Sequence, residues 1–559
     1  MKAQRLQEYV IGVDFGTDSV RSVLINAENG EEISSSVFYY IRWAAQQYCD
    51  PSRNQYRQHP QDYIDGLSAS LLDCAKQAGP EIWSAVKAIS IATTGSTPVA
   101  VNNNGTPLAL LPEFSNNPNA CFFLWKDHTA IKEAAEINEK ASDFLPNYLK
   151  YVGGIYSTEW YWAKLLYCLR TDEEIKQSAT GWVEHCDWIP FLLTGGTNLQ
   201  TLKRSVCAAG HKALWSPAYN GLPPENFFKS IDPLLTNFVL NYATAVYDSE
   251  QVAGTLCEEW SAKLGLPQNV KVGVGAFDAH MGAVGGEIQP FHLSKIMGTS
   301  TCDMMVVPFE QFGDKTVAGI CGQVKDSIIP GMVGLEAGQS AFGDVFAWYS
   351  NFITDAFLPL LSADLTHSPQ QLQKLRQSYN QQLINSLSAQ AAELTIHEDF
   401  PLAVDWLNGR RSPDADQHVK AAIIALDLGT SPAHIFYALA EATCFGAKAI
   451  VERFQREQVP VHGIIAMGGV AKKSPFIMQL MADVLQLPIR VHQSDQTCAM
   501  GAAMFAATVA GIYTSVSEAM QQMGCGFEKT YFHNPAKEKL LQDRYEKYSR
   551  LGQFLNSSN

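Results

Sequence analysis

Residues 9–26 read YVIGVDFGTDSVRSVLIN. Two short runs rich in β-branched residues, 9–13 and 20–25, flank a polar turn that contains glycine. This pattern predicts a strand, a tight turn and an antiparallel strand. Asp14 ends the first run, so we expect its carboxylate to project from the tip of the strand toward solvent or a metal ion.

The turn in this segment has the residue types that bind anions. Gly16 lets the backbone approach a ligand closely, and Thr17 and Ser19 offer backbone N–H groups and hydroxyls to anionic oxygens. A carboxylate beside such a turn suits a polyphosphate that carries Mg²⁺. The alternative is an ordinary hairpin with a glycine-containing loop, because short motifs also match by chance.

The second half of the chain repeats this pattern. Residues 295–307 read KIMGTSTCDMMVV, again a strand, a Gly/Thr/Ser turn and a strand. Two matched turns about 280 residues apart are much stronger evidence than one. They predict two domains that each present one phosphate-binding turn to a shared cleft. We place these domains at 1–288 and 289–559, with a polar helical insertion at about 357–400.

A third segment, residues 426–432, reads LDLGTSP and looks similar. The residues that follow it, 433–454, have helical periodicity, and Pro432 suits the first turn of a helix. A phosphate-binding hairpin needs a second strand at that place. We therefore reject this segment as a phosphate-binding turn.

Three further predicted strands lead into polar segments. The strand 86–92 precedes TTGSTP, and the strand 463–467 precedes a Gly-Gly turn and a helix. A Gly-Gly turn that enters a helix can seat a nucleoside or its phosphate, or it can be a simple connector. The strand 270–275 precedes Asp278 at a strand-to-helix junction, where Asp is a natural N-cap. A carboxylate held there could also accept a proton from an alcohol.

Composition limits the class of protein. The 559 residues are 46% hydrophobic and 17% charged, which suits a globular protein of more than one domain. The net charge of −15 disfavours nucleic acid and anionic membranes as partners. Twelve cysteines without a Cys-x-x-Cys pair indicate a reducing cytosol, and the histidines have no zinc-like spacing. The polar N-terminus and the absence of a long apolar run predict a cytoplasmic α/β protein.

Aromatic residues gather between 112 and 220. The segments LWKDHT (124–129) and YSTEWYW (156–162) place aromatic rings beside charged groups. Such rings can stack on the C–H faces of a polyhydroxylated ligand while polar neighbours bind its hydroxyls. Large aromatic side chains are more often part of a core, and that is the alternative interpretation.

Taken together, these motifs resemble the ATP-binding elements of the actin-like superfamily and, within it, the FGGY carbohydrate kinases. The resemblance runs from about residue 10 to 510 and is carried by the two turns, the Gly-Gly turn and the segments PNA (118–120), LWKDHT (124–129), GGIYS (153–157), AGHK (209–212), GLEAGQSAFG (334–343) and DWLNGRR (405–411). It implies an α/β fold of two ribonuclease-H-like domains, each a mixed sheet flanked by helices, with a central cleft.

The resemblance also implies a reaction and its site. It narrows to family members that use ATP and Mg²⁺ to phosphorylate L-ribulose, and also D-ribulose, at the O5 hydroxyl in L-arabinose catabolism. Asp278 resembles the catalytic base, and Asp14 the carboxylate that orients Mg²⁺ through water. The expected nucleotide-binding residues are Asp14, Gly16, Thr17, Ser19, Arg21, Gly298, Thr299, Gly343, Gly468, Gly469 and Lys473. The expected sugar-binding residues are Ser96, Trp125, Asp127, Lys212, Asp278 and Glu336.

Two positions depart from the family pattern, and two other functions stay open. Ala92 replaces an acidic residue, and Lys473 stands where relatives often carry Asn; these changes concern substrate preference and adenine contacts. One alternative is another FGGY kinase that acts on xylulose or a polyol such as glycerol. The other is an actin-like protein that holds ATP without catalysis. A homodimer is expected on family grounds only.

Overall fold

The computed structural model describes residues 7–243, 245–362 and 369–557. The first half of the chain is built on a mixed sheet with the strand order β11-β12-β5-β1-β2-β3, and β13 also pairs with β5. β1 runs antiparallel to β2 and parallel to β5. The strands of this sheet are β1 (Tyr9–Phe15), β2 (Ser19–Asn26), β3 (Glu32–Tyr39), β5 (Val86–Thr93), β11 (Val252–Thr255), β12 (Lys271–Gly273) and β13 (Ala276–Phe277).

The second half is built on a mixed sheet with the order β16-β17-β15-β14-β20-β21-β22. β14 runs antiparallel to β15 and parallel to β20, which is the same arrangement as β1 with β2 and β5. The predicted repeat of strand, turn and strand is therefore confirmed as a repeat of topology. The strands are β14 (His292–Met297), β15 (Thr301–Pro308), β16 (Gly322–Lys325), β17 (Met332–Ala337), β20 (Gly463–Met467), β21 (Ile489–His492) and β22 (Phe527–Tyr531).

Helices and four small ladders surround the sheets. The ladders pair β4 (Arg57–Gln58) with β7 (Phe122–Phe123), β6 (Pro98–Val101) with β8 (Gly181–Glu184), β9 (Arg204–Ser205) with β10 (Val246–Tyr247), and β18 (Leu402–Val404) with β19 (Ala422–Ile424). The helices of the first half are α1 (Ile41–Ala44), α2 (Pro60–Ala78), α3 (Pro80–Ser84), α4 (Ile131–Ala141), α5 (Tyr161–Thr171), α6 (Glu173–Ser178), α7 (His185–Leu193), α8 (Val206–Lys212), α9 (Glu225–Ile231), α10 (Thr236–Leu240), α11 (Glu258–Leu264) and α12 (Asp278–Gly285). Those of the second half are α13 (Phe309–Phe312), α14 (Gly343–Ser362), α15 (Pro369–Ala392), α16 (Pro432–Arg456), α17 (Gly469–Lys473), α18 (Pro475–Leu485), α19 (Thr497–Ala510), α20 (Val516–Met523) and α21 (Glu538–Ser557).

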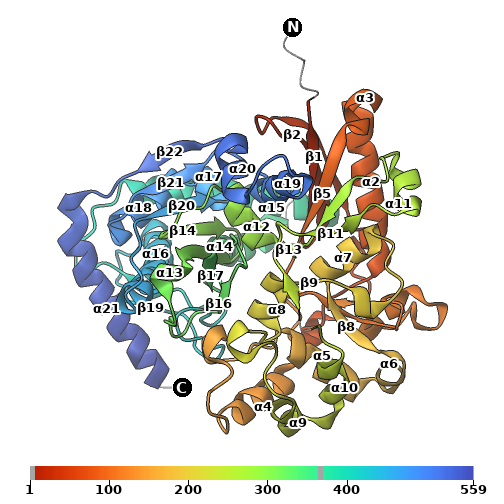
Figure 1. Cartoon of the computed structure of the whole chain (residues 1–559). Helices are drawn as coiled ribbons and strands as arrows, with labels where there is room; N and C mark the ends of the chain where they lie inside the picture. The colour runs from red at the N-terminus through yellow and green to blue at the C-terminus, as the bar shows by residue number, and fades with distance from the viewer. Residues whose placement is uncertain (1–6, 244, 363–368, 558–559) are drawn as a thin grey trace.

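Two helices, α12 and α19, pack against each other between the halves (Figure 1). α19 belongs to the second half in sequence, yet it packs on β1 and β5 of the first sheet, while α12 contacts α19 and also β14 and β15. Glycine makes this crossing possible. A Cβ at Gly501 would lie 1.8 Å from the carbonyl oxygen of Met281, and one at Gly285 would lie 1.9 Å from that of Thr497. The backbones of α12 and α19 are thus in direct contact.

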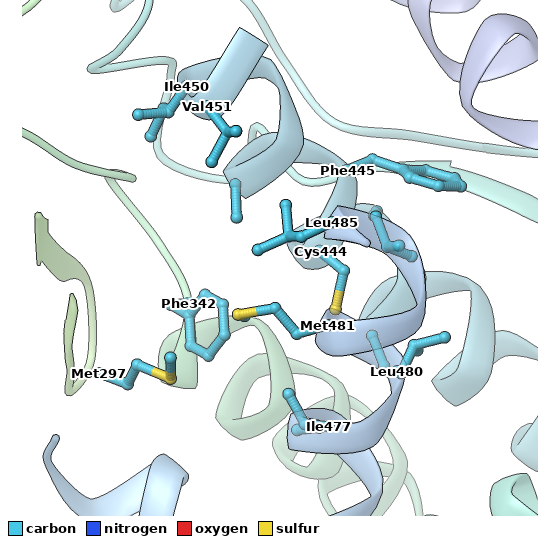
Figure 2. Packing of buried hydrophobic residues seen from close by; sticks show 14 of the residues in the cluster. Met297, Phe342, Cys444, Phe445, Ile450, Val451, Ile477, Leu480, Met481 and Leu485 are labelled. Atoms are coloured by element: carbon cyan, nitrogen blue, oxygen red, sulfur yellow. The ribbon is translucent and has the colours of Figure 1, made fainter. Parts of the chain in front are cut away.

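The core of the second half supports the turn between β14 and β15. Figure 2 shows Met481 of α18 directed toward Phe342 and Met297, which precede α14 and end β14 respectively. All three side chains are fully buried in one hydrophobic cluster. Burial of a large apolar side chain contributes about 1.5–3 kcal/mol. This packing fixes the backbone that carries the second predicted phosphate-binding turn.

The structure corrects three local predictions. The apolar run VFYYI at 37–41 predicts a strand only there, whereas β3 spans Glu32–Tyr39. The N-cap of α12 is Phe277, and Asp278 is the first residue of the helix rather than its cap. The helical segment expected at about 357–400 begins earlier, because α14 starts at Gly343; residues 363–368 lie outside the described part.

Other predictions agree with the structure. Ser431 caps α16, which starts at Pro432, so the rejected LDLGTSP segment does precede a helix. Ser431 and His434 form a reciprocal capping box there. Among the described residues, no helix has both the length and the apolar character needed to cross a membrane.

Candidate active site

The turn between β1 and β2 leaves backbone N–H groups open. The N–H of Gly16 donates to the Ser19 carbonyl at 2.9 Å. The Thr17 carbonyl accepts from the Gln58 amide at 2.6 Å, and the Asp18 carbonyl accepts from a backbone N–H before α1 at 3.0 Å. Within the described part of the chain, the N–H groups of Thr17 and Asp18 donate to no protein acceptor. These donors are available to an anion.

The turn between β14 and β15 is arranged in the same way. The N–H of Gly298 donates to the Ser300 carbonyl at 3.0 Å, and the Gly298 carbonyl accepts from Gly343 at 3.0 Å. The Thr299 carbonyl accepts from the N–H of Phe342 at 2.8 Å. The N–H groups of Thr299 and Ser300 have no acceptor among the described residues. Both turns therefore bind their carbonyls to the protein and leave donors open.

Two glycines let neighbouring segments approach the second turn. A Cβ at Gly343 would lie 2.4 Å from the Gly298 carbonyl oxygen, so only glycine allows α14 to begin there. Gly468 has a φ of +88° and its Cβ would lie 2.7 Å from the Met297 carbonyl oxygen. Both conditions, the left-handed backbone and the close contact, require glycine. The predicted nucleotide-binding segments of the second half are thus brought together.

The short helix α17 extends from this point. It begins at Gly469, where a Cβ would meet no atom within 4 Å, so the backbone faces open space. Lys473 ends the helix and is exposed. The neighbouring Lys472 is instead bound to Glu528 at 2.9 Å. Lys473 therefore lies at the opposite end of α17 from the predicted nucleotide-binding residue Gly469.

Two half-buried carboxyl groups, those of Asp14 and Asp278, lie close enough for their charges to interact. Asp14 pairs with Arg21 across β1 and β2, and its Oδ1 is buried without a hydrogen-bond partner among the described residues. Burial raises the pKa of Asp14 to about 6, and the Arg21 charge opposes the rise. The pKa of Asp278 rises to about 8, first through burial and then through the charge of Asp14. The Asp278 Oδ1 accepts the N–H of Ala279 at 2.6 Å, which fixes its direction.

An ion pair joins the two halves next to Asp278. Lys212 at the end of α8 donates to both carboxylate oxygens of Glu336 on β17, at 2.9 and 3.0 Å. His211 Nδ1 lies 3.2 Å from the same carboxylate, and its Nε2 lies 3.0 Å from the Ser327 hydroxyl. The Lys212 charge and the His211 hydrogen bond hold the pKa of Glu336 well below its usual range, against the effect of burial. A cation and an anion are thus presented together, which suits a ligand with several hydroxyls.

Sequence reasoning did not select several polar residues that the fold adds to this site. His280 follows Asp278 on α12, is 2% exposed, and neither ring nitrogen has a hydrogen-bond partner among the described residues. Its Nε2 lies 4.0 Å from Glu336. Arg411 of the second half lies 3.7 Å from Glu159 of the first. Arg411 stood in the family segment DWLNGRR and Glu159 in the aromatic segment YSTEWYW, but only the fold shows that they meet.

The remaining predicted sugar-binding residues differ in their placement. The Trp125 indole donates to the Thr17 hydroxyl at 3.0 Å, so it lies at the first turn. Ser96 is 1% exposed, and its hydroxyl donates to Glu184 at 2.6 Å. Asp127 is fully buried and forms an ion pair with Arg57. The structure does not bring the Asp127 carboxylate to the site, because it is buried in the core in its ion pair with Arg57.

Comparison with known proteins agrees with this geometry. The two mixed sheets, with α12 and α19 packed together between them, give a two-domain α/β protein with the actin-like fold. The FGGY family models match residues 9–285 (N-terminal domain) and 293–510 (C-terminal domain), and the chain belongs to the FGGY family of carbohydrate kinases. It is therefore a sugar kinase.

Individual relatives span nearly the whole chain. The chain is 46% identical to a ribulokinase of Vibrio parahaemolyticus over 98% of its length and 96% of that protein. It is 34% identical to a ribulokinase of Bacillus licheniformis, over 97% and 96% of the two chains. A solved structure from Brucella ovis, described as a xyloylose kinase, superposes with a TM-score of 0.79 at 17% identity and covers 99% of this chain and 100% of its own; it shows the fold.

Proposed function

We propose that this chain transfers the γ-phosphoryl group of Mg²⁺·ATP to O5 of L-ribulose, and also of D-ribulose, giving ribulose 5-phosphate and ADP. The observation that carries the proposal is the pair of turns with open N–H groups, one in each half, together with the interacting carboxyl groups of Asp14 and Asp278. Relatives named ribulokinase across the full length support the choice of sugar. In this reaction the chain serves L-arabinose catabolism in the cytoplasm.

The proposed chemistry uses the site residues as follows. The Asp278 carboxylate accepts the proton of the O5 hydroxyl, and O5 forms a bond to the γ-phosphorus. The bond from that phosphorus to the bridging oxygen breaks, and ADP leaves. A pKa of about 8 makes the Asp278 carboxylate a stronger base than an ordinary aspartate. Because phosphoryl transfer depends mainly on positioning and charge stabilisation, the open N–H groups of both turns supply most of what the protein contributes.

The residues around Asp14 fit a divalent cation. Its buried Oδ1 lacks a partner among the described residues, and a buried carboxylate oxygen is costly without one. We propose that Asp14 holds Mg²⁺ through water. When bound, Mg²⁺ neutralises part of the charge of the triphosphate. Arg21, opposite Asp14 in the hairpin, adds a fixed positive charge on the same side.

The sugar is proposed to lie against Lys212 and Glu336. Lys212 offers donors to the carbonyl and hydroxyl oxygens of a ketopentose, and Glu336 accepts from hydroxyl groups. Because these residues come from different halves, sugar and nucleotide binding are both coupled to how the halves meet. Closure over the ligands would exclude water as a competing acceptor.

A coupled ADP-release assay tests the proposal. Purified protein with Mg²⁺·ATP is given L-ribulose, D-ribulose, D-xylulose or glycerol in parallel. We expect fast turnover with the ribuloses and little with glycerol. Preference for D-xylulose or glycerol would make the chain a different FGGY kinase, and equal slow turnover with or without sugar would refute the sugar kinase mechanism. Light scattering on the same sample measures the expected homodimer.

A further inference from the structure

We propose that Lys126 is a phosphate-binding residue of this site and holds the terminal phosphoryl group of the nucleoside triphosphate. This inference rests on the proposed function. It concerns a residue of the segment LWKDHT that the sequence singled out, but that neither the reaction nor the sugar site used. Four observations support it, and they concern its backbone, its ring contacts, its missing partner and its position between the turns.

The backbone on both sides of Lys126 is fixed. Trp125 donates its indole N–H to the Thr17 hydroxyl at 3.0 Å. On the other side, Asp127 accepts the N–H of Tyr56 at 2.7 Å and pairs with the buried Arg57. A side chain between two anchored neighbours starts from a defined place, directly beside the first turn.

The ammonium group of Lys126 lies on two aromatic rings. Its Nζ is 4.5 Å from the centroid of the Tyr56 ring and 5.1 Å from that of the Trp43 ring. The Trp43 indole in turn donates to the Asp18 carboxylate at 2.7 Å. One of the two rings that carry the ammonium, that of Trp43, is therefore bonded to the same turn as Trp125. Cation–π contacts of this kind stabilise a charge and leave its N–H donors free.

The Lys126 ammonium has no anionic partner of its own. Among the described residues, no carboxylate lies within 4.0 Å and no acceptor within hydrogen-bond distance of Nζ. The opposite side of the site carries Asp344, whose carboxyl pKa is raised by burial and opposed by the Lys126 charge. The N–H of Asp344 donates to the Thr299 carbonyl at 3.1 Å, so Asp344 marks the second turn. Lys126 is thus held beside the first turn by its neighbour Trp125, and its charge acts on Asp344 at the second turn.

A triphosphate needs positive charge in this place. The surrounding carboxyl groups are Asp14, Asp18, Asp278 and Asp344, which repel an anion, and the charge of Arg21 is already opposed to that of its neighbour Asp14. Lys126 lies on uncharged rings beside the first turn, its charge acts on Asp344 at the second, and no anion among the described residues binds its ammonium, so it can supply this charge. The terminal phosphate is the part of the nucleotide that must lie between the turns when it is transferred, so it is the group that Lys126 contacts.

The test measures nucleotide binding as well as turnover. Lys126→Met, Lys126→Arg and wild type are titrated by calorimetry with Mg²⁺·ADP and with the non-hydrolysable triphosphate AMP-PNP. We expect Lys126→Met to lose about 10–100-fold in affinity for AMP-PNP, which corresponds to a charge-assisted hydrogen bond, and less than about 3-fold for ADP. Sugar-dependent kcat should fall by about 10²–10³. Lys126→Arg should recover part of both.

Lys263→Met is the matched control. The Lys263 ammonium lies 4.6 Å from the centroid of the Trp260 ring, so it is also a lysine on an indole, but on the helix α11 away from both turns. We expect this variant to bind AMP-PNP and turn over as wild type does. A loss at Lys263 equal to that at Lys126 would reduce the effect to general loss of surface charge and would refute the proposal.

A second variant separates phosphate binding from a contact between the halves. If Lys126 acted by pairing with Asp344 when the halves close, Asp344→Asn would lower the affinity for AMP-PNP as much as Lys126→Met does. The double variant would then lose no more affinity than either single variant. That result would overturn the proposal, as would equal losses for ADP and AMP-PNP. Wild-type protein without sugar-dependent turnover would instead refute the proposed function, and its AMP-PNP titration would still report on Lys126.

Discussion

The Asp278 carboxyl is buried at the first position of α12, and burial followed by the charge of Asp14 raises its pKa to about 8. Only the ionised form can accept a proton, so the fraction of competent enzyme increases as the pH rises through this value. We predict that kcat/KM for the sugar rises from pH 6 through pH 8, where it is half-maximal, and levels near pH 9. A profile that is flat over this range would show that a different group, or none, takes the proton.

The same residue has a cost for folding. Its pKa in the folded protein lies above the ordinary value of 3.8, so folding takes up a proton between about pH 4 and 8. The free energy of unfolding of the wild type therefore falls as the pH rises through that range. Asp278→Asn carries no charge to bury. We predict that it lowers kcat by about 10²–10⁴ yet melts higher than wild type at pH 8.5, by about 1 °C for each kcal/mol relieved in a chain of this length.

Calorimetry at two pH values checks this prediction. The gain in melting temperature should be small at pH 5 and full at pH 8.5. Asp399→Asn, which removes an exposed carboxylate, should melt as wild type does at both. Near-normal turnover of a folded Asp278→Asn protein would contradict the role of the carboxylate as base.

At the scale of elements, the crossing of α12 and α19 depends on glycine. A Cβ at Gly501 would overlap the backbone carbonyl of Met281, which cannot rotate away as a side chain would. We predict that Gly501→Ala destabilises the protein by about 1–3 kcal/mol or more. Urea unfolding measures this, and Gly469→Ala, where a Cβ meets no atom within 4 Å, should unfold at nearly the wild-type midpoint.

Elements with a clear periodic pattern were predictable from the sequence. The two hairpins and the helix after Pro432 follow from β-branched runs, glycine turns and helical spacing. β3 was predicted too late because its first half, Glu32 to Ser36, is polar. This strand lies at the edge of its sheet, where one side faces solvent and apolar residues are not required.

Contacts between distant residues set the limit at the site. Asp14, Asp278 and both turns could be found because each stands in a local strand-and-turn motif. The pairing of Lys212 with Glu336 joins residues 124 positions apart, and no local pattern encodes it; only the family resemblance placed both at the sugar. Asp127 is the opposite case. The family resemblance placed it at the sugar, but the fold buries its carboxylate in an ion pair with Arg57.

At the scale of the whole molecule, one hydrophobic cluster runs through both halves. It joins Val10 and Ala88 of the first sheet, Val284 of α12, Val306 of the second sheet and Phe505 of α19. We predict that fragments 1–288 and 289–559, produced separately, are insoluble or unfolded, and that co-expression restores a folded complex with sugar-dependent turnover. Soluble, cooperatively unfolding single fragments would contradict this and support halves that are independent. The boundary after residue 288 stays a prediction until then.

The packing of α19 on the first sheet also has a consequence during protein synthesis. The ribosome completes β5 early, but α19, which covers β1 and β5, is made about 400 residues later. At about 5–20 residues per second this interval lasts about 20–80 s. Throughout that time the face of the first sheet that α19 covers stays open. The nascent chain therefore needs another protein to shield these apolar strands until α19 has been translated.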